Sequence, residues 1–317
     1  MGFEAGRGRV PSQREIGGSE VEKAIARLKC EKNAGMDGIT AEMLKYGGDA
    51  VVEWMLLICE RAWKKGEVPD DWKKAIIVPL YKGKGSRSEC SSYRGISLVS
   101  IPGKVYGRIL TERLMEVTEG KVSEEQGGFR KGRGCVDQIF AMKRLVEEYL
   151  GKDKKLYAAF MDLEKAYDRV DREALWSVLR IYGVGGQLLK GIQAFYREAN
   201  ACVRVGAKFS ESFAVEVGVR QGCVMSPWLF NIFMDGCMRE MKCKVVNAGA
   251  KLRLNGEIWS LVMCLFADDT VLLAEREGDL QRVVNEFYSV CKRRKLKVNA
   301  GKSKVMVFER REDEVFD

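Results

Sequence analysis

Residues 261–274, LVMCLFADDTVLLA, limit the possible folds more than any other segment, because two apolar runs flank a pair of aspartates. We interpret the segment as a β-hairpin in which 261–266 runs in, 267–269 turns and 270–274 runs out. Aspartate is common in turns, so the pair needs no function on that ground alone. The tip is not the usual Asn-Gly or Asp-Gly sequence, however, and two adjacent carboxylates repel unless a cation relieves them.

A third carboxylate, Asp162, ends another apolar run whose alternating pattern over residues 156–161 predicts a strand. An aspartate at a strand end also has an ordinary explanation, as a terminator or helix cap. Magnesium prefers oxygen ligands, and three aspartates on neighbouring strands would suit a two-metal site. The chain has no histidine and no CxxC pair among its ten cysteines, which excludes His-based catalysis and argues against a zinc site.

The remaining pattern alternates helices with strands and predicts an α+β fold with helices against one face of a sheet. The first helix is expected to start at Ser19, with Glu22 completing a capping box. Further helices are predicted over residues 49–65, 135–150, 172–182, 227–234 (with Ser226 as its cap) and 279–294, and further strands near 75–80, 93–99, 201–217 and 304–308.

The net charge of +9 is concentrated in two segments. Residues 73–108 hold eight Lys or Arg and one acid, and residues 291–304 hold seven and none. Such one-sided clusters favour nucleic acid as a partner, although a solvated face or an acidic membrane surface would fit the charge as well. No run approaches the roughly 20 apolar residues of a membrane span, and the pattern contains no long amphipathic basic helix that would lie on a membrane surface, so no membrane partner is expected.

Three motifs together resemble the central motifs of reverse transcriptases, most closely those of non-LTR retrotransposons of LINE type, in particular RTE-like elements. In chain order they are FMDLEKAYDRVD, GVRQGCVMSPWLFNIFMD and the FADD hairpin. Segments around WKKAIIVPLYKGKG, YRGISL, EEQGGFRKGRG and VNAGKSKVMVF also match in family order. The resemblance implies the right-hand polymerase fold, with fingers and an antiparallel palm sheet packed on helices.

The same resemblance implies a domain plan. It comprises a disordered tail over residues 1–18, an N-terminal extension and fingers over 19–155, a palm over 156–310 and a stub over 311–317, so that the thumb is largely absent. The hairpin near residues 201–217 is expected to border the fingers. Gly95 stands where many relatives have proline, which loosens that turn without removing charge.

The implied metal site consists of Asp162 and Asp268 bridging two Mg²⁺ ions, with Asp269 beside them and the carbonyl of Leu163 as a backbone ligand. Tyr167 matches the aromatic residue under the incoming sugar, where its ring would exclude a 2′-hydroxyl; taken alone it would be an ordinary core aromatic.

Around the nucleotide, Gln221 matches the residue beside the nascent base pair, and Gly222 would let the backbone approach the template.

Cationic positions follow from the resemblance as well. Lys82 and Arg94 match the two fingers cations that grip the triphosphate, although either could be a surface residue, and Arg130 matches a template-phosphate contact. Lys302 matches a lysine that protonates the leaving pyrophosphate, with Lys304 as a nearby alternative.

The implied function is that of an RNA-directed DNA polymerase domain of a retrotransposon, with Mg²⁺ (Mn²⁺ as a substitute), dNTPs, a DNA primer and an RNA template. Its implied setting is intracellular, in the nucleus or cytoplasm, as a ribonucleoprotein with the element RNA. The alternative is a catalytically inactive or domesticated fragment that only binds nucleic acid.

Overall fold

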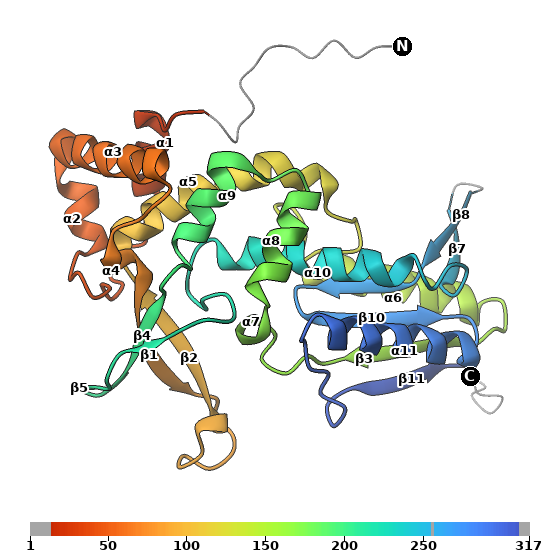
Figure 1. Cartoon of the computed structure of the whole chain (residues 1–317). Coiled ribbons are helices and arrows are strands. Elements are labelled where there is room, and N and C mark those ends of the chain that lie inside the picture. The colour runs from red at the N-terminus through yellow and green to blue at the C-terminus, as the bar shows by residue number, and fades with distance from the viewer. Residues whose placement is uncertain (1–13, 255–256, 311–317) are drawn as a thin grey trace, which may run out of the picture. The chain divides into compact units, whose positions relative to one another are not determined.

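The computed structural model describes residues 14–254 and 257–310. Contacts divide the chain into two compact units: Met1–Lys121 with Leu179–Trp228, and Val122–Val178 with Leu229–Asp317 (Figure 1). The tail expected over residues 1–18 lies mostly outside the described residues, and the stub at 311–317 lies wholly outside them. The predicted boundary between fingers and palm stays a prediction.

The first unit contains a sheet with the strand order β2-β1-β4-β5, in which β6 also pairs with β4. β1 and β2 form the predicted antiparallel ribbon, whereas β1 and β4 run parallel. The predicted hairpin near 201–217 therefore joins the sheet that contains β1 and β2. The strands are β1 (Lys74–Tyr81), β2 (Tyr93–Val99), β4 (Asn200–Val205), β5 (Lys208–Phe209) and β6 (Phe213–Ala214).

Helices build the rest of the first unit. They are α1 (Gly18–Ala26), α2 (Ala41–Tyr46), α3 (Gly48–Lys65), α4 (Asp70–Lys73), α5 (Ile101–Thr118) and α9 (Gly186–Ala194), with the short turns η1 (Cys90–Ser92) and η2 (Glu119–Lys121). The capping box predicted for Ser19 and Glu22 is wrong. Gly17 is the residue that caps α1, two residues before the predicted Ser19, and its N–H donates to Glu20 Oε2 at 3.0 Å.

The second unit is built on a four-stranded sheet with the order β11-β3-β10-β9, and every pairing in that sheet is antiparallel, as predicted. Its strands are β3 (Leu156–Met161), β9 (Met263–Phe266), β10 (Asp269–Ala274) and β11 (Lys304–Phe308), and the hairpin β7 (Ala250–Leu254) and β8 (Glu257–Leu261) forms a separate ribbon. The helices α6 (Cys135–Leu150), α7 (Ala166–Arg169) and α11 (Glu277–Arg293) belong to this unit, whereas α8 (Arg172–Ile181) and α10 (Ser226–Lys242) cross the division between units.

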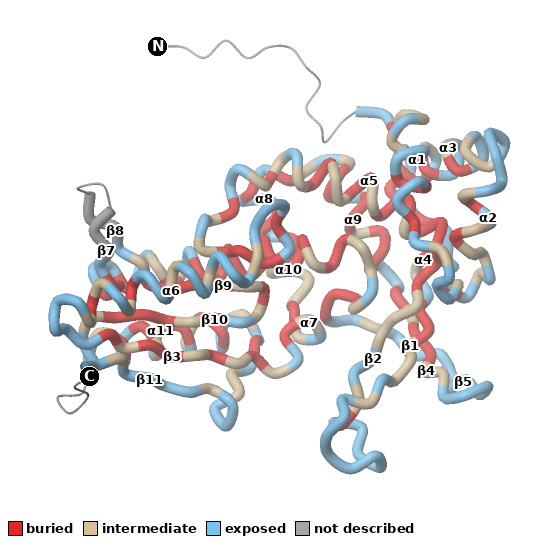
Figure 2. The backbone as a smooth tube through the Cα atoms, turned by 180° about the vertical axis from the view of Figure 1, so that it is seen from behind, coloured by how far each residue is buried: buried red, intermediate tan, exposed pale blue. Residues whose placement is uncertain are grey.

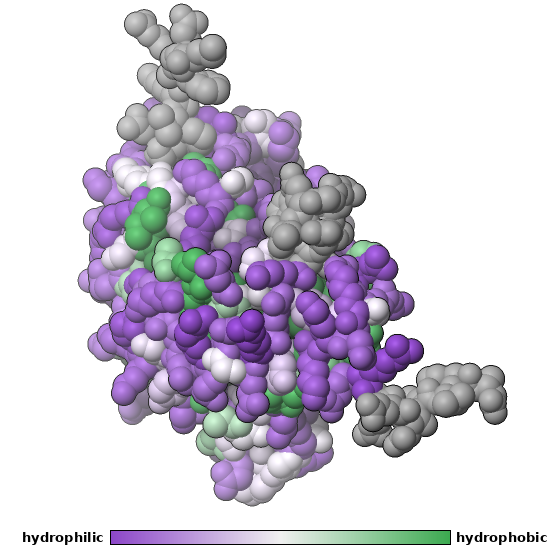
Figure 3. All heavy atoms as spheres, turned by 90° about the vertical axis from the view of Figure 1, so that its right-hand side faces the viewer, coloured by the Kyte–Doolittle hydropathy of each residue, from purple (hydrophilic) through white to green (hydrophobic). Residues whose placement is uncertain are grey.

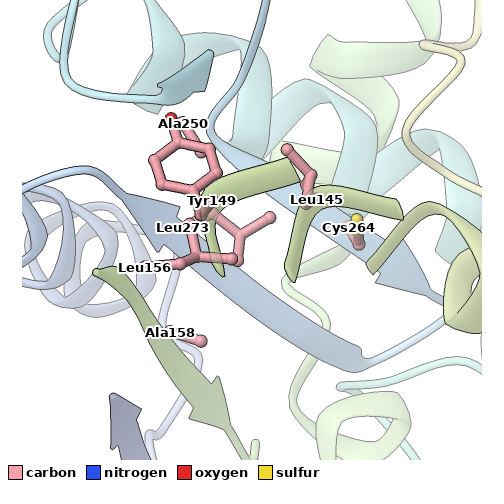
Figure 4. Packing of buried hydrophobic residues seen from close by; sticks show 7 residues of the cluster. All are labelled: Leu145, Tyr149, Leu156, Ala158, Ala250, Cys264 and Leu273. Atoms are coloured by element: carbon pink, nitrogen blue, oxygen red, sulfur yellow. The ribbon is translucent and has the colours of Figure 1, made fainter. Parts of the chain in front are cut away.

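Helices cover the four-stranded sheet on both faces, not on one as predicted. Leu145 and Tyr149 of α6 pack with Leu156, Ala158 and Leu273 in one buried cluster, which Figure 4 shows from close by. α11 packs against β10 and β3 and lies in front of them in Figure 1. β3 and β10 are accordingly buried, whereas the edge strand β11 is largely exposed (Figure 2). Side chains alternate between the two faces of a strand, so a sheet covered by helices on both faces needs apolar residues on both, and β3 and β10 have them.

The face in Figure 3 is mostly hydrophilic, with hydrophobic residues scattered over it. Within the described ranges, no helix combines the length and the apolar character that crossing a membrane requires.

A buried arginine ties the start of the first unit to α5. Arg113 is fully buried; its Nε and Nη2 donate to the two Glu20 carboxylate oxygens at 2.9 and 2.7 Å. Its Nη1 and Nη2 also donate to the carbonyls of Arg14 and Glu15, at 2.6 and 2.8 Å, and its guanidinium lies 4.7 Å from the Trp63 ring centroid. These bonds satisfy backbone groups of a segment that has no regular structure.

We expect Arg113→Met to lower the free energy of unfolding by about 3–5 kcal/mol, because the carbonyls of Arg14 and Glu15 lose their donor and the partly buried Glu20 keeps only Arg14 and the Gly17 N–H as partners. Arg27→Met is the matched control, since Arg27 also joins the α1 region to α5 through Glu112, but on the surface. It should cost about 1 kcal/mol or less. Urea unfolding measures both, and equal losses would contradict the assignment.

The same pair predicts an acid dependence. Burial raises the pKa of Glu20, but the hydrogen bonds from Arg113 and the Gly17 N–H outweigh it and hold the pKa below its ordinary value. The resulting stability is fully present above the unfolded-state pKa of about 4.3 and is lost as pH falls through the lower folded-state pKa. Urea midpoints measured between pH 6 and pH 3 should therefore fall less steeply for Glu20→Gln than for the unmodified chain.

Candidate active site

The predicted catalytic aspartates lie at one edge of the four-stranded sheet. β3 ends at Met161, so Asp162 is the next residue. Met161 pairs with Thr270 of β10, and one further step along the antiparallel register aligns Asp162 with Asp269. The sheet thus brings together the two sequence segments that carry the aspartates, as the sequence predicted.

The hairpin between β9 and β10 is tighter than predicted. Phe266 pairs with Asp269, so the turn consists of Ala267 and Asp268 alone, and Asp269 already belongs to β10. Ala267 has a φ of 61°, in the left-handed region. A two-residue hairpin with positive φ at its first position normally has glycine there. Asp268 is half-buried and Asp269 is exposed.

Residues that the sequence did not single out fix the backbone at this edge. The Asp162 N–H donates to Ser303 Oγ at 3.2 Å, and its carbonyl accepts from the Asn299 N–H at 2.8 Å. Ser303 Oγ in turn donates to the Asn299 carbonyl at 2.9 Å. On the hairpin side, the Gln126 side chain binds the backbone of Ala267. The only sequence signal for these residues was their place inside segments that match the family.

The Asp162 carboxylate fits a cation site. Its Oδ2 atom is buried and has no hydrogen-bond partner, and the Lys302 ammonium lies 3.6 Å away. A buried carboxylate oxygen without a donor is costly unless a positive charge compensates it. Among the described residues no three carboxylate or thiol groups converge on one point, but Mg²⁺ commonly uses one or two carboxylates together with substrate phosphates.

Tyr167 and Leu163 follow Asp162 closely. The Tyr167 ring, in α7, stacks on the buried Phe230 with centroids 4.4 Å apart and planes at 17°. This contact holds the ring in one orientation. Leu163 is buried and forms an isolated antiparallel bridge with Val298, so its backbone position is fixed as well. The roles of both residues stay predictions.

The two expected triphosphate cations lie on the β1–β2 ribbon of the first unit. Arg94 pairs with Leu80, and Lys82 lies two residues after Leu80, so both cations project from the same face of the ribbon. Both are exposed, although Lys82 Nζ donates to the Ser91 carbonyl at 2.8 Å. Their role in binding the triphosphate stays a prediction.

Gln221 and Gly222 contact β2 through their backbone. The Ser97 N–H donates to the Gln221 carbonyl at 2.8 Å. Gly222 has a φ of 108°, and a Cβ there would lie 2.5 Å from the Ser97 carbonyl oxygen. Glycine is therefore required for packing against the protein's own strand, a reason the sequence did not indicate.

The preceding Arg220 is buried, which lowers its pKa, and it binds the carbonyls of Trp72, Lys73 and Phe195.

Arg130, expected to contact template phosphate, is buried in the structure. Its Nη1 donates to the carbonyls of Ser123 and Gln126 at 3.0 and 3.3 Å, within its own loop. The guanidinium thus holds the loop together, and the template contact stays a prediction.

The basic segment at residues 291–304 is largely neutralised by acids from elsewhere in the second unit. Arg293 and Arg294 bind Glu240, and burial alone would raise the pKa of Glu240, but these two guanidinium groups lower it. The other ion pairs are Lys295–Asp171 and Lys297–Glu164, together with Lys302–Asp162. The run of basic residues is therefore weaker evidence for phosphate binding in the folded chain than in the sequence alone.

Comparison with known proteins gives a family match. Residues 81–315 match the model of the family described as reverse transcriptase (RNA-dependent DNA polymerase). The chain is 31% identical over 287 residues to a putative 115 kDa protein in the type-1 retrotransposable element R1DM of Drosophila melanogaster, covering 87% of this chain and 25% of that protein. It is 25% identical over 302 residues to the RNA-directed DNA polymerase from mobile element jockey of Drosophila melanogaster, covering 92% and 32%.

A third relative, the transposon TX1 uncharacterized 149 kDa protein of Xenopus laevis, is 28% identical over 265 residues, which cover 83% of this chain and 20% of that protein. The chain thus spans between a fifth and a third of these three relatives.

Among solved structures, apo telomerase from Candida tropicalis, truncated from its C-terminal domain, is similar with a TM-score of 0.55 at 14% identity, covering 83% of this chain and 56% of that one. This likeness confirms the predicted right-hand polymerase fold. Since the family model covers most of the chain and the relatives are non-LTR retrotransposon proteins, the chain belongs to the reverse transcriptase (RNA-dependent DNA polymerase) family, in its LINE-type branch.

Proposed function

We propose that this chain is the polymerase part of a non-LTR retrotransposon protein and adds dNTPs to a DNA 3′ end on an RNA template. The observation that carries the proposal is the edge of the four-stranded sheet, where the register aligns Asp162 with the Asp268–Asp269 end of the hairpin. The Oδ2 atom of Asp162 is buried and accepts no hydrogen bond, and the Lys302 ammonium lies 3.6 Å from it, so positive charge already gathers at this position and a cation would fit there. Family membership supplies the reaction class.

In this proposal Asp162 and Asp268 hold two Mg²⁺ ions, with Asp269 and the Leu163 carbonyl as further oxygen donors. Bound divalent ions would lower the pKa of the primer 3′-hydroxyl and neutralise charge on the α-phosphate and pyrophosphate. Mn²⁺ accepts the same oxygen ligands and is expected to substitute.

Cationic side chains complete the proposed chemistry. Lys302 lies beside Asp162 with a side chain that is 64% exposed, so its ammonium can exchange the carboxylate for the leaving pyrophosphate and protonate it. Lys82 and Arg94, on one face of their ribbon, bind the triphosphate, as point charge and planar fork.

Tyr167 selects the sugar in this proposal. Because its ring is stacked on buried Phe230, it cannot rotate away cheaply when a 2′-hydroxyl presses against it. Gln221 lies beside the nascent base pair, and Arg130 and Gly222 support the template side. The RNA of the element and a DNA primer are the proposed partners, in a ribonucleoprotein.

The first test compares Asp268→Asn with the unmodified chain in primer extension on poly(rA) with oligo(dT) and Mg²⁺. We expect a loss in kcat of about 10³-fold, since removing a charged ligand costs several kcal/mol of transition-state stabilisation. Asp279→Asn in α11 is the control, because that carboxylate pairs with Arg282 on the surface. Salt-sensitive RNA binding without incorporation by the unmodified chain would favour the nucleic-acid-binding alternative.

The second test concerns the sugar. Tyr167→Ala should raise the ratio of kcat/KM for rNTP to that for dNTP by about 10- to 100-fold, because a hydroxyl-sized clash is removed. Tyr167→Phe keeps the ring and should keep the selectivity. Tyr288→Ala, at an exposed position in α11, controls for loss of a tyrosine. An unchanged ratio in Tyr167→Ala would assign the ring to the core only.

A further inference from the structure

Gln126 contacts the turn that carries Asp268, although it lies far from that turn in sequence. Its side chain is 1% exposed. The amide Nε2 donates to the Ala267 carbonyl at 3.3 Å, and Oε1 accepts from the Ala267 N–H at 3.0 Å. Oε1 also accepts from the Gly128 N–H at 2.9 Å. One buried amide therefore satisfies both backbone groups of Ala267.

Ala267 is the residue that needs such support. Its φ of 61° is a conformation that alanine adopts at a cost, and no glycine relieves it. A strained residue persists where surrounding structure over-determines it, and such residues gather at functional sites. The next residue in the chain is Asp268, so the backbone angles of Ala267 decide where that carboxylate points.

The segment around Gln126 is itself tied to the hairpin. The Leu265 N–H donates to the Glu125 carbonyl at 2.9 Å, and the Gly127 N–H donates to the Leu265 carbonyl at 2.9 Å, so the segment forms a short parallel bridge beside β9. On its other side, Asn231 of α10, fully buried, donates to the Gly128 carbonyl. The Gln126 amide is thus held in place before it reaches Ala267.

Two adjacent glycines allow this approach to different degrees. A Cβ on Gly128 would lie 2.3 Å from the Ala267 nitrogen and 3.0 Å from its Cα, so the turn itself would have to move. A Cβ on Gly127 would meet the end of the Gln138 side chain at 2.7 Å, which can swing aside. Gly128, not Gly127, is therefore the close contact with the turn.

We propose that Gln126 is a positioning residue for the polymerase reaction: it locks Ala267 in its left-handed conformation and thereby fixes the Asp268 carboxylate for metal binding. The inference rests on the proposed function for its catalytic meaning. Its physical content, the orientation of a metal-binding carboxylate by a buried amide, can be measured without catalysis.

The test uses Gln126→Met, which keeps the side-chain length and removes both hydrogen-bonding atoms, and Gly128→Ala, which disturbs the same turn from the other side. The matched controls are Gln281→Met, at a glutamine of α11 whose amide donates to Asn285 on the surface, and Gly127→Ala. Mn²⁺ binding is measured by the EPR signal of the free ion, kcat and the dNTP KM by primer extension, and folding by circular dichroism and thermal melting.

We expect Gln126→Met and Gly128→Ala to lower Mn²⁺ affinity and kcat by about 10- to 100-fold, as loss of a group that orients a metal ligand typically does. The dNTP KM should stay within about twofold, since substrate contacts are untouched. Both controls should match the unmodified chain. If Gln126→Met does not fold, Gly128→Ala alone carries the test.

Variants that melt at lower temperature but keep the Mn²⁺ affinity and kcat of the unmodified chain would overturn the proposal and leave Gln126 a structural residue. A change in the dNTP KM as large as the change in kcat would also contradict it. If the unmodified chain binds Mn²⁺ but extends no primer, the proposed function fails while the Mn²⁺ comparison still decides the role of Gln126.

Discussion

The antiparallel register between β3 and β10 is the constraint on which the candidate site depends. Pairing Met161 with Thr270 leaves Asp162 and the Ala267–Asp268 turn at the same edge of the sheet. A slip of one residue would turn Leu273 and Ala158 out of the cluster they share with α6, because successive side chains alternate between faces. Burial of both sheet faces thus fixes the strand register, and the register determines where the carboxylates of the candidate site lie.

The sequence predicted those elements whose pattern is local. β3, α6 and α11 followed from periodicity, and the aspartate hairpin from its two apolar runs, because each signal lies within a few residues of its effect. The family motifs then predicted the fold, which is confirmed, and singled out the carboxylates, whose catalytic role stays a prediction. One local prediction was wrong, the cap of α1. The capping pair is Gly17 and Glu20 instead of Ser19 and Glu22, because the two pairs have the same spacing and overlap in the sequence.

Contacts between distant segments were beyond sequence reasoning. Nothing near Gln126 indicates that its amide meets Ala267, and nothing near Asn299 and Ser303 indicates that they bind the Asp162 backbone. The prediction of phosphate binding from the basic segment was weakened for the same reason. The charged residues of segment 291–304 are all basic, but in the folded chain Glu240, Asp171 and Glu164 from other elements form ion pairs with them. Charge runs predict a surface potential only when the partners of the run are also known.

Three buried polar side chains solve one physical problem in this chain. Arg113 and Gln126 bind backbone groups of segments outside regular structure, and Arg220 binds carbonyls at the C-terminal ends of α4 and α9, where no helical N–H reaches them. Each of the three side chains is less than 10% exposed. An irregular segment leaves carbonyl and N–H groups unpaired, and each unpaired group in the interior costs about 1–3 kcal/mol. A side chain with several hydrogen-bonding atoms removes that cost at one position. Gln126 differs from the two arginines because the segment it completes carries a catalytic candidate, so a requirement of folding and a requirement of function meet in one amide.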